Sequence, residues 1–145
     1  MRHVVRFWIV FAVLGLPSAS LFAQDAPKAD PGTSLGSITL TKKVLADGQP
    51  LAPGTYQVRV GAGEPKPAVG QSPDGERYVE FLKAGTVVGR EVATVISNTE
   101  MATMEKWGKP APNSTKVETL KGGDYLRVWI NRGGNNYLIH LPPAA

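Results

Sequence analysis

Cysteine is absent from the 145-residue chain, and histidine occurs only twice. Without cysteine there is no disulfide, no thiol nucleophile and no thiolate ligand for a metal. His140 is the only histidine beyond the N-terminal segment, and no Gly-x-Ser-x-Gly motif is present, so no nucleophile with an adjacent base can be recognised. The spacings typical of zinc, calcium and phosphate-loop sites are also missing. We therefore predict no catalytic residue, no metal site and no cofactor.

Long hydrophobic runs are also scarce. The main one covers residues 7–16, about half of the roughly 20 residues that a membrane-spanning helix needs. Arg2 and Arg6 flank its start, and Pro17 with several small residues up to Ala23 follows it. This order is typical of a secretory signal peptide, predicted over residues 1–23. Because no cysteine follows for lipid attachment, we expect an exported protein, periplasmic or secreted, without a membrane anchor in its mature chain.

A strong excess of one charge is missing as well. The formal net charge is +4, and the signal peptide holds two of the 16 basic residues and none of the 12 acidic ones, which leaves +2 for the mature chain. This charge is small and scattered, whereas nucleic-acid binding needs a clustered basic face. The 122 residues after Ala23 suit one domain.

What the mature chain does contain is strand periodicity. Residues 24–36 are rich in Ala, Pro, Asp and Gly, and we interpret them as a flexible leader. From residue 37 to residue 145, apolar and polar residues alternate between turn residues, which predicts about seven strands. The segments 61–75 and 98–114 lack this period. The first is predicted as a loop, and the second as a loop packed by Trp107, with one short helical turn as the alternative. The expected fold is all-β, a single small antiparallel β-sandwich, with a barrel as the alternative.

The last predicted hairpin gives the clearest pattern. Residues 126–132 and 135–141 flank Gly133-Gly134, a pair that provides the positive φ angles of a two-residue turn. This register places Arg132 opposite Asn135. It also gathers six apolar or aromatic residues on one face, namely Leu126, Val128, Ile130, Tyr137, Ile139 and Leu141. Because the turn and the hydrophobic pattern agree, we predict this pairing directly.

One segment resembles a known structural motif. Residues 47–60 read DGQPLAPGTYQVRV, in which Pro53-Gly54 forms a turn and Tyr56, Val58 and Val60 enter a core. This segment is similar to the Pro-Gly-Thr-Tyr strand entry of transthyretin-like domains, such as carboxypeptidase regulatory-like modules. It is also similar to small exported bacterial proteins of unassigned function. The resemblance implies a β-sandwich fold and brings no functional residue with it.

The other face of the last hairpin offers one candidate surface. Tyr125, Arg127 and Trp129 alternate along one strand, and His140 lies on the neighbouring strand. Aromatic rings in such a row can stack on sugars, and protein interfaces are also enriched in Tyr, Trp and Arg. We therefore name these four residues as a candidate ligand-binding surface. The alternative interpretation is that another part of the chain covers Trp129.

Three functions fit these observations. The first is a non-enzymatic binding or structural module, whose partner is a protein or a polysaccharide outside the cytoplasm. The second is a carbohydrate-binding accessory domain that uses the Trp129 face. The third and weakest is a hydrolase, because a pair of catalytic carboxylates can form in space without any sequence motif.

The signal peptide leads to a direct prediction. When the full chain is expressed in an exporting host, N-terminal sequencing of the released protein should find a start within a few residues of Gln24, because Ala23 ends the small-residue stretch. Full-length protein that stays in the cytoplasm would contradict both the cleavage and the export.

Overall fold

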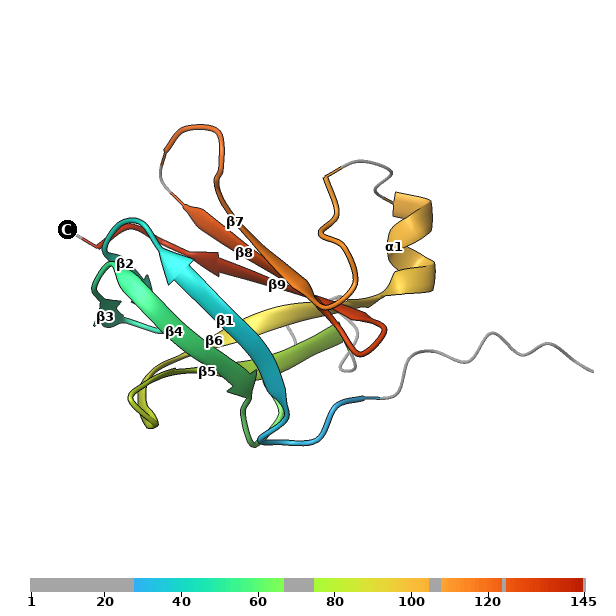
Figure 1. Ribbon diagram of the computed structural model, residues 1–145, viewed down its shortest axis with the longest axis horizontal. Coiled ribbons are helices and arrows are strands. Elements are labelled where there is room, and N and C mark those ends of the chain that lie inside the picture. Colours follow the sequence, from blue (N-terminus) through green and yellow to red (C-terminus); the bar gives the residue numbers. More distant parts are fainter. Residues whose placement is uncertain (1–27, 67–74, 105–107, 124, 145) are drawn as a thin grey trace, which may run out of the picture.

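The computed structural model describes residues 28–66, 75–104, 108–123 and 125–144 (Figure 1). In this part of the chain, nearly all of the regular structure is strand, with one short helix. In chain order the elements are β1 (Ser34–Leu40), β2 (Val44–Ala46), β3 (Gln49–Leu51), β4 (Gly54–Val60), β5 (Glu76–Lys83), β6 (Thr86–Ser97), α1 (Asn98–Met104), β7 (Ser114–Thr119), β8 (Leu126–Arg132) and β9 (Asn135–Leu141).

Seven of these strands form one antiparallel sheet, in the order β1-β4-β5-β6-β9-β8-β7. The sheet curls until its two edge strands lie side by side, and the Thr115 hydroxyl of β7 donates to the Ser37 carbonyl of β1 at 3.3 Å (Figure 1). The predicted all-β antiparallel fold is thus confirmed. Of the two arrangements considered, the structure has the barrel-like one, with the apolar core inside.

The hairpin of β8 and β9 has the predicted register. Arg132 pairs with Asn135, and the pairing continues without a shift to Leu126 and Leu141. Gly133 and Gly134 have φ angles of 62° and 80°, as the two-residue turn requires. All six residues of the predicted apolar face are buried in the core. Local turn chemistry and strand alternation therefore determine this part of the barrel.

A small hairpin closes one end of the barrel. Val44 and Ala46 of β2 and Leu51 of β3 are buried in the core, and the Leu45 amide donates to the Pro142 carbonyl at 2.8 Å. The next strand, β4, starts at the Pro53-Gly54 turn, and Tyr56 enters the core. The segment that resembles transthyretin-like domains therefore forms this end closure and the strand after it.

The β5–β6 hairpin contains an irregularity in its pairing, at the place where the β2–β3 hairpin packs against it. The ladder shifts between Phe81 and Leu82, so that Phe81 pairs with Gly89 and a bulge lies beside this glycine. Gly89 faces inward, and a β-carbon there would lie 3.0 Å from Leu51 and 3.2 Å from Ala46. The absence of a side chain at residue 89 therefore makes room for the β2–β3 hairpin.

Two segments differ from the expectations. β1 begins at Ser34, ahead of residue 37 where the alternation begins, because Leu35 is already buried in the core. Residues 98–104 form the short helix α1, which was the alternative to the loop expected there. The predicted signal peptide, the first part of the leader, and Trp107 lie outside the described residues. No helix of the described ranges is long and apolar enough to cross a membrane.

The close contact at Gly89 predicts a stability effect. Gly89→Val should lower the free energy of unfolding by about 1–3 kcal/mol, because the added carbons would overlap Leu51 and Ala46. Gly75→Val is the matched control, since a β-carbon at Gly75 meets nothing within 4 Å. Urea denaturation of both variants tests this. Equal losses of stability would show that the hairpin does not pack tightly on Gly89.

Candidate pocket at the open end of the barrel

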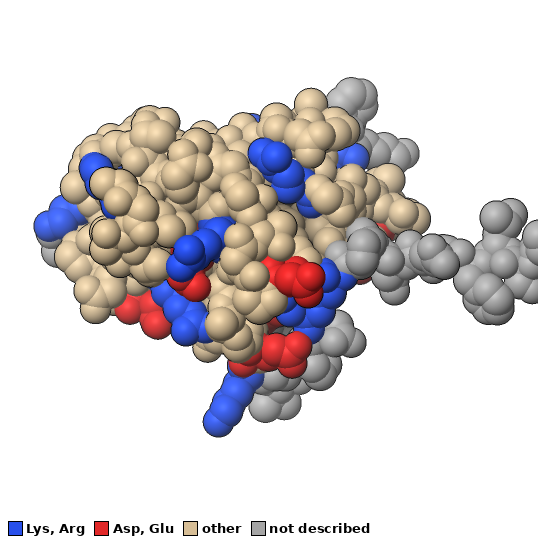
Figure 2. Space-filling view, turned by 60° about the horizontal axis from the view of Figure 1, so that its bottom comes forward, with Lys and Arg blue, Asp and Glu red and all other residues tan. Residues whose placement is uncertain are grey.

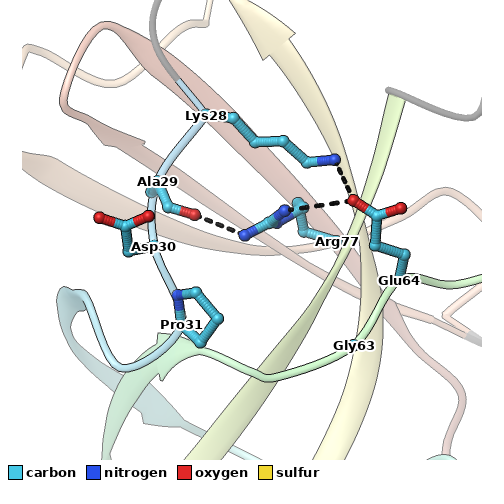
Figure 3. A pocket seen from close by; sticks show the side chains of 7 residues that line it. All are labelled: Lys28, Ala29, Asp30, Pro31, Gly63, Glu64 and Arg77. Atoms are coloured by element: carbon cyan, nitrogen blue, oxygen red, sulfur yellow. Dashed lines mark hydrogen bonds and ion pairs between the residues drawn. The ribbon is translucent and has the colours of Figure 1, made fainter.

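The end of the barrel opposite the β2–β3 hairpin carries a pocket of about 260 Å³. Here β1 and β5 begin and β4 ends, so segments that are far apart in the sequence meet. The close-up in Figure 3 shows the side chains around the pocket, with Arg77 in the middle. The lining residues are Lys28, Ala29, Asp30, Pro31, Gly63, Glu64 and Arg77.

A tight turn holds the first wall of the pocket. The Thr33 amide donates to the Asp30 carbonyl at 3.1 Å, with Pro31 and Gly32 at the inner positions that suit a type II turn. The Gly32 amide also donates to the Val60 carbonyl at 2.8 Å, which ties the turn to the end of β4. The end of the segment predicted as a flexible leader is therefore hydrogen-bonded in place through Asp30, Gly32 and Thr33.

Arg77 forms the base of the pocket because of strand alternation. It lies on the same side of β5 as Val79 and Phe81, both fully buried, so its side chain points into the barrel. The side chain is only 9% exposed. A guanidinium group stays charged and carries several N–H donors. Burying it is therefore costly unless acceptors surround it.

The structure provides few acceptors for this group. Nη2 donates to the carbonyl of Ala29, and Nη1 lies 3.9 Å from Oε1 of Glu64, beyond hydrogen-bond distance (Figure 3). The Nε atom is buried and has no hydrogen-bond partner among the described residues. Among the described residues, Arg77 thus has donors without an acceptor, and its guanidinium group lines a pocket that opens to solvent.

Further polar groups lie inside the same end of the barrel. Tyr137 is 2% exposed, and burial raises the pKa of its hydroxyl, against the opposing effects of a hydrogen bond with Asn135 and of the Arg77 charge. Arg132 faces Asn135 in the ladder and lies against Gly36, where a β-carbon would come within 2.9 Å of its Nη2. One end of the interior is therefore apolar, and the other is polar and positively charged.

The rim of the pocket is balanced in charge. Lys28 Nζ and Glu64 Oε1 are 2.6 Å apart, and the hydrogen bond and charge of Lys28 hold the pKa of Glu64 below its usual value. A general acid in a hydrolase needs a raised pKa instead. Glu64 is therefore suited to an ion pair and not to the role of a general acid. On the face shown in Figure 2, basic and acidic side chains likewise lie next to one another.

The predicted surface on the other side of the last hairpin is only partly exposed. Trp129 is only 2% exposed, so its ring cannot stack on a sugar, whereas Tyr125 is 45% exposed. Arg127 and His140 are paired across β8 and β9 on the same side as Trp129. Three of the four residues thus share a face, but they form no exposed aromatic row. The observation that favoured carbohydrate binding is lost.

Trp129 is buried through a network of asparagines. Its Nε1 donates to Oδ1 of Asn136 at 2.9 Å, and Nδ2 of Asn136 donates to Oδ1 of Asn98 at 2.8 Å, where α1 begins. Nearby, Nδ2 of Asn131 donates to the Pro110 carbonyl at 2.9 Å. The segment between β6 and β7 is thereby bound to the outer face of the hairpin, as the alternative interpretation of the sequence expected.

The remaining side chains of that face pair with each other. Glu118 accepts hydrogen bonds from Arg127 and Lys116. Burial alone would raise the pKa of Glu118, but these two cations outweigh it and lower the pKa. Arg127 also lies 5.3 Å from the centre of the Trp129 ring. Burial and the charge of Arg127 lower the pKa of His140. Glu118, Arg127 and Lys116 thus balance one another's charges on this face.

Comparisons with known proteins add no relative. No family model, no curated protein and no solved structure matches this chain. Within the described ranges, no group of three or more His, Asp or Glu side chains is placed to hold a metal ion. The pocket residues were not among the sequence candidates, although one signal was present: Arg77 occupies an inward position in the alternation with Val79 and Phe81.

The burial of Trp129 predicts a large stability effect. Trp129→Ala should lower the free energy of unfolding by about 3–5 kcal/mol, because it leaves a cavity and removes a partner of the buried Asn136. Tyr125→Ala should change it by less than about 0.5 kcal/mol, since Tyr125 is exposed. Guanidinium denaturation compares the two. A smaller loss for Trp129→Ala than for Tyr125→Ala would mean that the ring is exposed after all.

Proposed function

We propose that this chain is an exported, non-enzymatic binding module that takes a small ligand into the pocket at the Arg77 end of the barrel. Export is inferred from the signal peptide predicted over residues 1–23. The observation that supports binding is Arg77, a 9% exposed guanidinium with unused donors at the base of a pocket. A pocket with a few convergent polar groups is the usual form of a small-ligand site.

The shape of the pocket supports this proposal. Its walls come from the turn at residues 30–33 and from the segment around Gly63, both at strand ends. A barrel with a filled interior leaves its ends for function, since loops and turns there can vary without loss of the core. The opposite end is occupied by the β2–β3 hairpin.

A chemical-shift screen tests the proposed function. Acetamide, acetate, methylammonium and cellobiose, each at millimolar concentration, are added to the ¹⁵N-labelled mature protein. At least one probe should shift the amides of residues 28–30, Gly63, Glu64 and Arg77. Cellobiose should leave the amides around Tyr125 and Arg127 unchanged, because Trp129 is buried there.

Two tryptophan variants, one in the pocket lining and one outside it, are compared in the same screen. Asp30→Trp should abolish the shifts by filling the pocket, because Asp30 is exposed at its wall. Thr55→Trp should preserve them, because Thr55 is exposed on β4 and does not line the pocket. Shifts confined to the Tyr125 side, or no shifts with any probe, would overturn the proposed function.

A further inference from the structure

We infer that the ligand of this pocket carries a free carboxylate, which binds the guanidinium group of Arg77 in the position that Glu64 only approaches. This inference rests on the proposed function and specifies its ligand class. It depends on the donors that Arg77 leaves unused, on the loose position of Glu64, and on the charges around the pocket.

The unused donors favour a planar anion. A guanidinium group matches a carboxylate by two parallel hydrogen bonds, and such charge-assisted bonds are about twice as strong as neutral ones. In Arg77, Nη2 is engaged with a backbone carbonyl and Nε is buried from solvent, so Nη1, which has no hydrogen bond among the described residues, is the donor open to a ligand. Among the described residues, the buried charge has an ion pair with Glu64 at 3.9 Å, beyond hydrogen-bond distance, so a neutral ligand would give it no hydrogen-bonded anionic partner. A carboxylate would provide that partner.

Glu64 already brings a carboxylate to this position without binding firmly. Its side chain is 66% exposed, and its Oε1 is 2.6 Å from Lys28 Nζ but 3.9 Å from Arg77 Nη1 (Figure 3). Glu64 can therefore stay on Lys28 while a ligand carboxylate approaches Arg77. The negative charge of Glu64 then weakens binding, because it repels the incoming anion.

The charge balance selects a monoanion. Among the lining residues, Lys28 and Arg77 are opposed by Asp30 and Glu64. One additional negative charge is met by Arg77, but a phosphate dianion would also face both acids. The pocket volume of about 260 Å³ is close to the lower end of small-molecule sites, so it suits the carboxylate end of a ligand rather than a large ring system.

The test titrates the mature protein with N-acetylglycine, with its neutral methylamide and with inorganic phosphate, at constant pH and ionic strength. The Nε–H signal of Arg77 and the amides of the pocket are followed by NMR. N-acetylglycine should shift the Arg77 Nε–H signal and bind more tightly than either other probe. An alanine tetrapeptide with a free C-terminus, compared with its C-terminal amide, distinguishes a chain end from a small molecule as the source of the carboxylate.

Variants give effects of opposite sign. Arg77→Gln should weaken the affinity for N-acetylglycine at least about tenfold. Glu64→Gln should strengthen it by about two- to fivefold, because a neighbouring anion is removed. A merely structural role for Glu64 would not produce tighter binding. Arg59→Gln is the control, since Arg59 pairs with Glu80 on the outside of β4 and should leave the affinity unchanged. If Arg77→Gln does not fold, the tighter binding of N-acetylglycine expected of Glu64→Gln still tests the carboxylate assignment.

The outcomes separate the two proposals. Equal binding of N-acetylglycine and its methylamide, tighter binding of phosphate, or no gain in Glu64→Gln would overturn the carboxylate assignment while the pocket remains a binding site. The absence of any pocket shift with all probes would overturn both the carboxylate assignment and the proposed function.

Discussion

Closure of the sheet around a filled interior is the constraint on which the rest of this structure depends. Seven antiparallel strands bring every second side chain inward, and β1 meets β7 at the seam. A barrel of this size has no room for a channel, so its inward residues must fill the space and its ends must be closed separately. The β2–β3 hairpin closes one end with apolar residues, whereas the other end is left to Arg77, Arg132 and Tyr137.

This asymmetry has an energetic meaning. Apolar closure by Val44, Ala46 and Leu51 removes hydrophobic surface from water and stabilises the fold. At the other end, Nε of Arg77 is buried without an acceptor among the described residues, and such a donor costs about 1–3 kcal/mol. A core residue such as Met at position 77 would avoid this cost. The cost is understandable if the guanidinium group acts on something outside the chain, which is why the pocket rather than the sealed end supports a binding function.

The parts that the sequence predicted correctly are those that depend on local chemistry. Gly133-Gly134 and the alternation on both sides of it determine the β8–β9 register. The face of Trp129 could be assigned as well, but its burial could not. The covering segment has no strand period, and it is attached by single hydrogen bonds from Asn136 and Asn131. Contacts of this kind leave no periodic signal in a sequence.

The pocket escaped prediction for a related reason. Its walls come from residues 28–31 and 63–64, two segments whose Pro and Gly content reads as loop, and only the fold brings them to Arg77. Yet the inward position of Arg77 was visible in the alternation of β5. A charged residue at an apolar position of a predicted strand conflicts with the pattern around it, and such local conflicts concentrate at functional sites. In small barrels, an inward arginine near a strand end is therefore the residue from which to begin a search for a site.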